Sequence, residues 1–358
     1  MGERTRGRRW SAVVVVLAVV VSACSSPGPG AGSPTTRAAG TRASTGAPVP
    51  SSACSAPGAG AGSTAAAVTE QRTDLTVDGV ARWYLLTTPP VRAGAGPLPV
   101  VVDLHGLAEG ATLEAMTTQF GPTAQRDGFI VVFPEGTGSP VGWDIAPATS
   151  AHPNHDIDFM KAMLDQLEAH ECVDTSRIYA AGFSDGALFT SLLACTMAGR
   201  FAAFAAVAGA VMPEPCDPGR RVPIVAFHGT ADPILYFNGG VGTAALNHDL
   251  GQGPAPTTTT PPPVDLDGKG YPANVKAWAR YDGCDLHPTD TKVSPHVILR
   301  TYRCPPGAAV DFYVVMGGGH AWPGSKLSAA LSSITGPSTF EIDATGIIWQ
   351  FFGHHRLA

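Results

Sequence analysis

Residues 177–188 read RIYAAGFSDGAL, and this stretch decides the fold of the chain. Its first half is short, apolar and partly aromatic, as buried strands of parallel sheets are. Residues 182–186 then match the pattern G-x-S-x-G, and residues 187–197 are expected to form a helix. A strand, a tight turn and a helix in this order mark a nucleophile elbow, so Ser184 is the candidate nucleophile. An ordinary glycine-flanked turn is the alternative, because short motifs recur by chance.

Apolar runs and amphipathic stretches alternate on both sides of this turn. Residues 98–104 (LPVVVDL) and 129–133 (FIVVF) are continuous apolar runs, which predict buried strands. Further elements are expected as strands at 201–208, 222–228, 297–302 and 311–316, a hairpin at 74–87, and helices at 112–126, 156–170, 271–281 and 339–354. This alternation predicts an α/β fold with a mostly parallel central sheet, helices on both faces and an antiparallel hairpin at one edge.

A serine hydroxyl becomes a good nucleophile only when a base takes its proton and an acid orients that base. Asp232 follows the strand expected at 222–228, and His320 follows the strand expected at 311–316. The order Ser184, Asp232, His320 is that of the α/β-hydrolase triad, and each residue stands where a strand ends. These three residues are therefore the candidate nucleophile, acid and base of an α/β-hydrolase fold.

Two other histidines and one other carboxylate are rivals for these roles. His228 lies at the end of the strand that precedes Asp232, and it is expected to hydrogen-bond within the loop. His105 stands in a His-Gly pair after the strand at 98–104, a place that more often shapes an oxyanion loop. Asp185 begins the helix after Ser184 and is expected to point away from the site.

The oxyanion of an acyl-transfer reaction needs two fixed hydrogen-bond donors. The backbone N–H groups of Leu107 and Asp185 are the candidates, since one belongs to the loop after the 98–104 strand and the other follows the nucleophile. His105, Trp143 and Trp322 are candidate walls of a substrate pocket, although the two tryptophans fit a core position equally well.

The first 67 residues differ in composition from the rest. Residues 1–23 join a basic start to a short apolar run that ends in Val-Ser-Ala, directly before Cys24. This pattern is typical of a lipoprotein signal peptide with Cys24 as the lipidated residue; a plain secretory signal is the alternative. Residues 24–67 are rich in Ser, Pro, Gly and Ala and are expected to form a flexible tether, and residues 68–358 the catalytic domain.

Seven cysteines are present, and six remain when Cys24 is set aside. An even number in an exported chain indicates disulfides, although six cysteines allow 15 pairings. Pairs that enclose one local unit are favoured, namely Cys195 with Cys216 and Cys284 with Cys304. Cys54 with Cys172 then follows by elimination.

Charge and spacing exclude several classes of function. The formal net charge of the 358 residues is −6, and no run of lysine or arginine remains beyond the basic start, so no nucleic-acid partner is expected. The cysteines and histidines show no C-x-x-C or H-x-x-x-H spacing, so no metal site and no cofactor are expected.

Four motifs resemble one family. LHG at 104–106, GFSDGA at 182–187, FHGTADP at 227–233 and GGGHAWPG at 317–324 are similar to motifs of the polyhydroxybutyrate depolymerase and feruloyl esterase family of α/β-hydrolases. With the lipoprotein signal and the tether, the chain also resembles LpqC-type esterase lipoproteins of actinobacteria. Depolymerase members often carry Cys and Gln directly after His-Gly, whereas this sequence has Leu107, Ala108 and Glu109.

The resemblance implies a secreted serine esterase that is held on the cell envelope by its lipid and forms an acyl-enzyme. The implied partners are the membrane and an ester substrate, such as a feruloyl-sugar, acetyl-sugar or short hydroxyalkanoate ester. An envelope acyltransferase would use the same triad and is one alternative. A glycan- or lipid-binding protein of the same fold is another, but it would have no need to keep Ser184, Asp232 and His320 together.

Overall fold

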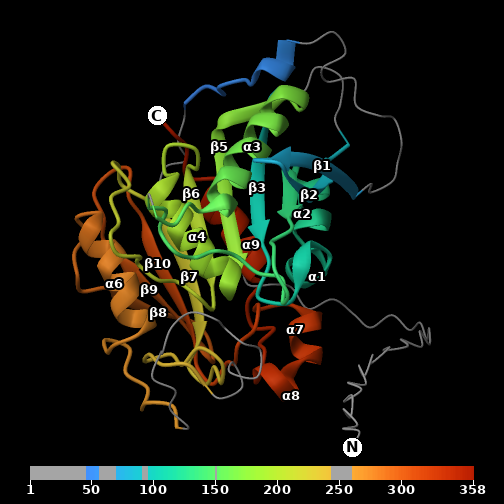
Figure 1. Ribbon diagram of the computed structural model, residues 1–358. Helices are drawn as coiled ribbons and strands as arrows, with labels where there is room; N and C mark the ends of the chain where they lie inside the picture. The colour runs from blue at the N-terminus through green and yellow to red at the C-terminus, as the bar shows by residue number, and fades with distance from the viewer. Residues whose placement is uncertain (1–45, 56–69, 91–95, 150, 243–259) are drawn as a thin grey trace, which may run out of the picture. The chain divides into compact units, whose positions relative to one another are not determined.

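The computed structural model describes residues 46–55, 70–90, 96–149, 151–242 and 260–358. Within these residues a ten-stranded sheet forms the centre of the fold (Figure 1). Its strands are β1 (Gln71–Val77), β2 (Val80–Thr87), β3 (Leu98–Leu104), β4 (Ile130–Pro134), β5 (Val173–Phe183), β6 (Ala203–Val207), β7 (Ile224–Gly229), β8 (Thr289–Ser294), β9 (Val297–Tyr302) and β10 (Val310–Val315). The helices are η1 (Ser52–Ser55), α1 (Gly110–Thr118), α2 (Phe120–Asp127), α3 (His155–His170), α4 (Asp185–Thr196), α6 (Tyr271–Tyr281), α7 (Lys326–Ala330), α8 (Ser332–Thr335) and α9 (Ala344–Phe352).

The strand order is β1-β2-β4-β3-β5-β6-β7-β10-β9-β8. The strands from β4 to β10 in this order run parallel, and antiparallel strands flank them at both edges. The expected hairpin of β1 and β2 forms one edge, whereas β8 at the other edge was not expected. Its sequence TDTKVS is exposed almost throughout and carries no apolar alternation, so the sequence pattern does not reveal it.

The side chains of the central strands alternate between two apolar cores, one on each face of the sheet. On β3, Val100, Val102 and Leu104 pack in the core that contains α3, α4 and α6, while Val101 packs in the core that contains α1, α2 and α9. The two sets of helices therefore cover opposite faces, as Figure 1 shows. This is the α/β-hydrolase fold, with a mostly parallel sheet between helices.

The order in which the chain adds strands to the sheet reverses at β3, which is a topological switch point. From β3 it passes to β4 on one side, and then crosses to β5 on the other side. In open α/β sheets such a switch point leaves a crevice at the carboxyl ends of the two strands. The loop after β3 and the elbow after β5 therefore face each other there.

Two expected helices differ from the structure. The helix expected at 112–126 is divided into α1 and α2 at Gln119, whose φ is 57°. Pro122 has no N–H and its ring would clash with the carbonyl of Thr118 in a continuous helix, and this carbonyl instead accepts a hydrogen bond from the Thr345 hydroxyl. The closing helix begins at Ala344 rather than at residue 339, because Asp343 before it is extended and the carbonyl of Thr339 accepts the N–H of Gly324.

Residues 46–55 belong to the segment expected to be a tether, yet they pack on the catalytic domain. Ser51 exchanges hydrogen bonds with Val173 at the start of β5, and Cys54 is bonded to Cys172. The tether expectation is wrong for these ten residues, because a disulfide and backbone hydrogen bonds compensate for their lack of apolar side chains. The expected signal peptide, Cys24 and most of the tether lie outside the described residues. None of the described helices combines the length and the apolar character that a membrane crossing requires.

Candidate active site

Ser184 lies in the tight turn between β5 and α4. Its φ of 54° and ψ of −117° are unusual for a residue other than glycine. The adjoining glycines permit this turn, because a Cβ on Gly182 would collide with the carbonyl of Gly186, and a Cβ on Gly186 would collide with the carbonyl of Leu104. The side chain of Ser184 is thus held at the carboxyl edge of the sheet, half-buried beside the loop after β3.

Of the three residues expected from the motifs, His320 lies within hydrogen-bonding distance of both Ser184 and Asp232. His320 Nε2 is 2.7 Å from Ser184 Oγ, and His320 Nδ1 is 2.8 Å from Asp232 Oδ2. Because the carboxylate can only accept, Nδ1–H donates to Asp232, and the lone pair of Nε2 is left for the serine hydroxyl. His320 and Asp232 are 4% and 2% exposed, so bulk water does not compete for these bonds.

Backbone hydrogen bonds fix the two partners of Ser184. Asp232 Oδ1 accepts from the N–H groups of Ile234 and Leu235, both at 2.8 Å. The N–H of His320 donates to the carbonyl of Thr335 at the end of α8 at a distance of 2.6 Å. The loop after β10 is therefore held over the sheet edge by a segment that the sequence analysis did not assign to a helix.

The charges of this pair shift both pKa values. Burial raises the pKa of Asp232, but the charge of His320 and the hydrogen bonds from His228 and His320 outweigh burial, so the pKa lies below its usual range. Burial lowers the pKa of His320, but the charge of Asp232, their hydrogen bond and the charge of Glu109 leave it above its usual range. The pair therefore favours a charged imidazolium, which is the state that a base reaches after it has taken a proton.

His228 also contacts Asp232, and it does not contact Ser184. Its Nε2 lies 2.8 Å from the carbonyl oxygen of Leu235 and 3.3 Å from Asp232 Oδ2, and its ring stacks on Tyr271 at 3.7 Å. The rings of His228 and His320 thus approach the same oxygen of Asp232, Oδ2. The spacing of four residues between His228 and Asp232 is the only sequence signal for this contact.

The two N–H groups expected to bind an oxyanion have no acceptor within the described part of the chain. Neither the N–H of Leu107 nor that of Asp185 donates there. The next residue, Ala108, has φ of 64° and donates its N–H to the carbonyl of Val141, which fixes the loop. The Asp185 carboxylate turns to the backbone N–H of Trp143, at 2.8 Å, and so does not compete with Asp232 for the imidazole.

The three expected pocket residues belong to the core instead. Trp322 is 1% exposed, donates to the Thr345 hydroxyl and packs edge-on against Phe120. Trp143 stacks on Phe189 and donates to the carbonyl of His105. These tryptophans therefore support the elbow from behind and do not form a wall for substrate.

His105 is held inside the loop after β3 rather than at a substrate surface. It is fully buried, its Nε2 accepts the N–H of Gly136 at 2.9 Å, and its Nδ1 donates to the carbonyl of Gly106 at 2.7 Å. Burial lowers the pKa of this imidazole, in spite of the Gly106 carbonyl and two nearby carboxylates. This burial does not fit the expected pocket role of His105, and its two hydrogen bonds fix the loop after β3.

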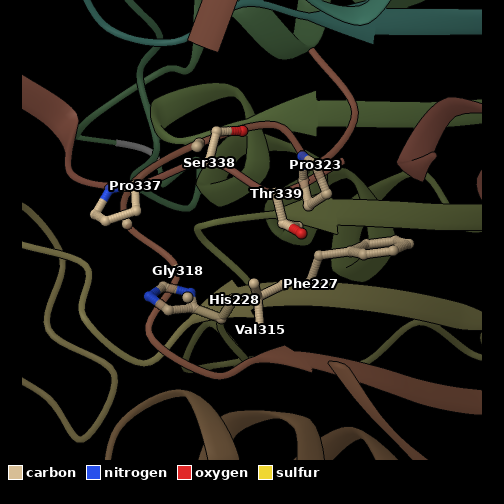
Figure 2. Close-up of a pocket in the computed structure, with 11 residues that line it drawn as sticks. Phe227, His228, Val315, Gly318, Pro323, Pro337, Ser338 and Thr339 are labelled. Carbon is tan, nitrogen blue, oxygen red and sulfur yellow. The ribbon is translucent and has the colours of Figure 1, made fainter. Parts of the chain in front are cut away.

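A small pocket lies next to the loop after β10, as Figure 2 shows. Phe227, His228, Val315, Pro337 and Ser338 contribute to its lining, and none of the three triad candidates does. His228 Nδ1 and Ser338 Oγ have no hydrogen-bond partner in the part of the chain that the structure describes. The pocket thus lies beside the candidate triad and is not the place where an ester carbonyl would meet Ser184.

One group of side chains among the described residues has atoms close enough to hold a metal ion. Asp78, His155 and Asp158 lie together at the surface, within 4.8 Å of one another. Asp78 and His155 are exposed, and the group joins the β1–β2 turn to the start of α3. None of its members is one of the three triad candidates.

The described cysteines form three disulfides. The pairs are Cys54–Cys172, Cys195–Cys216 and Cys284–Cys304. The second ties the carboxyl end of α4 to the loop between β6 and β7. The third joins the loop after α6 to the end of β9.

Known proteins of similar sequence are esterases. The family model described as Esterase PHB depolymerase matches residues 83–244. Feruloyl esterase B of Piromyces equi is 29% identical over 254 residues, which are 69% of this chain and 44% of that protein. A protein of Nocardia uniformis named "Putative esterase NocK" is 30% identical over 278 residues, which are 72% of this chain and 76% of that protein.

Two further matches extend the comparison. "Probable feruloyl esterase C" of Aspergillus clavatus is 30% identical over 212 residues, which are 56% of this chain and 75% of that protein. The solved structure of an acetyl xylan esterase from Aspergillus awamori has 16% identity and a TM-score of 0.49, and covers 70% of this chain and 94% of that one. The chain spans under half the length of the Piromyces protein but three quarters of the Nocardia and Aspergillus clavatus proteins. On these sequence matches, the chain belongs to the Esterase PHB depolymerase family.

Proposed function

We propose that this protein is a serine carboxylic ester hydrolase that acts through an acyl-enzyme. The observation that carries the proposal is the continuous hydrogen-bonded series from Ser184 Oγ through His320 to Asp232, with distances of 2.7 and 2.8 Å. Its location at a strand–turn–helix elbow with positive φ at the serine adds support.

The proposed reaction has two halves. Ser184 Oγ attacks the ester carbonyl carbon while His320 Nε2 takes its proton, and Asp232 stabilises the resulting imidazolium. The negative charge on the former carbonyl oxygen is bound by the N–H groups of Leu107 and Asp185. His320 then returns the proton to the leaving alcohol, and a water molecule activated by the same imidazole releases the acid and restores Ser184.

The proposed substrates are esters of feruloyl or acetyl groups with sugars, or short hydroxyalkanoate esters. Relatives named feruloyl esterase and a bifunctional acetylxylan esterase/xylanase support this class. Export to an oxidising compartment is part of the proposal, and the three disulfides support it. The proposal also includes lipidation at Cys24, which would hold the enzyme on the cell envelope.

A covalent probe tests the central claim. A fluorophosphonate should label the protein at Ser184, and peptide mapping should find the adduct on the peptide that contains it. The variant Ser184→Ala should stay unlabelled and lose turnover of p-nitrophenyl acetate, methyl ferulate and acetylated xylan on the order of 10⁴-fold or more. Ser191→Ala, a change on the next turns of α4, is the matched control and should keep both. Labelling that persists in Ser184→Ala would remove the proposed nucleophile.

A further inference from the structure

Three acidic side chains form a row of interacting carboxyl groups at the loop that follows β3, namely Asp103, Glu114 and Glu109. Asp103 and Glu114 are fully buried, and Asp103 Oδ2 accepts a hydrogen bond from the Thr118 hydroxyl at 2.6 Å. Asp103 Oδ1 and both carboxyl oxygens of Glu114 contact no N–H or O–H donor of the described residues. Because a buried carboxylate without donors is very unfavourable, this row must hold at least one proton.

Glu114 is the member that holds the proton. Burial, together with the charges of Asp103 and Glu109, raises the pKa of Glu114 far above its usual range. A protonated Glu114 can donate to either neighbour, and its hydrogen bonds act against burial at Asp103 and Glu109. Burial still dominates, so it raises the pKa of Asp103 to about 7 and also raises the pKa of Glu109. The row therefore extends from the core at Asp103 to the loop at Glu109 with Glu114 between them.

Glu109 is the end of the row that meets the candidate active site. Its Oε2 accepts the backbone N–H of Gly106 at 3.0 Å, one residue before the oxyanion candidate Leu107. Gly106 lies between two side chains: a Cβ there would be 2.7 Å from Glu109 Oε2 and 3.3 Å from the Cβ of Ser184. The carboxyl group of Glu109 is thus separated from Ser184 by a single glycine, and its charge acts on the imidazole that Ser184 contacts.

We propose that Glu109 is a positioning residue of the active site, with two tasks. It holds the oxyanion loop through the N–H of Gly106, and as a carboxylate it adds to Asp232 in stabilising the imidazolium of His320. The inference rests on the proposed function, because it concerns the same serine and histidine.

The ionisable groups around this site define the expected direction. Asp232 and Glu109 face His320, Glu114 faces Glu109, and His228 faces Asp232. Burial raises the pKa of Glu109 in spite of its hydrogen bond from Gly106, the charge of His320 and its contact with Glu114. Loss of the Glu109 charge would remove one of the two anions that favour the imidazolium. The His320 pKa should then fall, and the imidazole should remain a neutral base to lower pH.

The test is the pH dependence of inactivation by diisopropyl fluorophosphate, which needs the serine and its base but no particular ester. In Glu109→Gln the carbonyl of the amide can still accept the Gly106 N–H, so only the charge is removed. We expect the midpoint of the acid limb to move down by about 0.5–1 pH unit relative to wild type. Glu135→Gln is the matched control, since Glu135 also binds a loop N–H, that of Ala111 at 2.7 Å, but does not act on His320. Its midpoint should stay at the wild-type value.

A second variant separates charge from anchoring. Glu109→Ala removes both, so its midpoint should move as in Glu109→Gln while its limiting rate of ester turnover should fall further. Midpoints that stay at the wild-type value in both folded variants would overturn the inference and leave Glu109 as a loop anchor only. A wild-type protein that resists diisopropyl fluorophosphate at every pH would instead reject the proposed function itself.

Discussion

At the scale of single residues, the two histidines near Asp232 have different tasks. His320 contacts both Ser184 and Asp232, whereas His228 contacts Asp232, the carbonyl of Leu235 and the ring of Tyr271. Motifs located the triad candidates in the sequence, because each follows an apolar strand and the carboxyl ends of such strands meet. The contacts of His228 and Glu109 could not be predicted this way, since they depend on the exact approach of loops that are distant in the chain.

This difference predicts distinct variants. His320→Ala should lose ester turnover on the order of 10⁴-fold at pH 7 because the base is gone. His228→Ala should lose about 10-fold, because one hydrogen bond to a charged group contributes about 1.5 kcal/mol.

In wild type, activity should fall with decreasing pH at a midpoint above the ordinary histidine value of 6.5, since the net shift of the His320 pKa is upward. Rates measured from acid to neutral pH, with circular dichroism to verify folding, check all three; equal losses in the two variants would contradict the assignment.

At the scale of secondary structure, the sequence was most informative where apolar residues are continuous or recur at the spacing of a helix. The strand at 98–104 and the helix at 271–281 have the same bounds in the structure as the pattern predicts. The short helices α7 and α8 were not predicted, because their residues are mostly exposed and carry no amphipathic repeat. Yet α8 supplies the carbonyl that holds His320, so an element with a weak sequence signal takes part in building the site.

The disulfide Cys54–Cys172 gives a prediction at this scale. It fixes residues 46–55 at the start of β5, whereas Ser184 stands at the opposite end of that strand. The double variant Cys54→Ser, Cys172→Ser should therefore unfold more easily, by about 2–4 kcal/mol, since the bond closes a loop with a sequence separation of 118. Its turnover below the unfolding transition should equal that of wild type. Thermal unfolding and steady-state rates on the same samples check this, with Cys284→Ser, Cys304→Ser as a second disulfide for comparison; lost turnover in folded protein would show that the elbow depends on the start of β5.

At the scale of the whole molecule, a catalytic domain follows a long segment of another composition. Residues 24–45 and 56–67 keep the Ser, Pro, Gly and Ala bias that predicts a tether, while residues 46–55 between them are fastened to the domain. Composition alone could not reveal this contact, because Cys54 is the one residue in it with a strong structural signal. If Cys24 carries the lipid, the reach from the lipid to the domain is therefore limited by the 21 residues between Cys24 and residue 46 rather than by the whole segment.

Lipidation of Cys24 can be tested in a bacterial host that processes lipoproteins. Wild type should partition into the detergent phase, because several acyl chains on Cys24 would give far stronger membrane affinity than one chain. Cys24→Ser should leave that phase, and Ser25→Ala, the neighbouring control, should stay in it. Intact mass spectrometry should find the lipid mass on wild type and on Ser25→Ala alone. Cys24→Ser and Ser25→Ala should hydrolyse a soluble ester as fast as wild type, since neither change touches the described domain. An unmodified Cys24 in wild type would reject the lipid anchor.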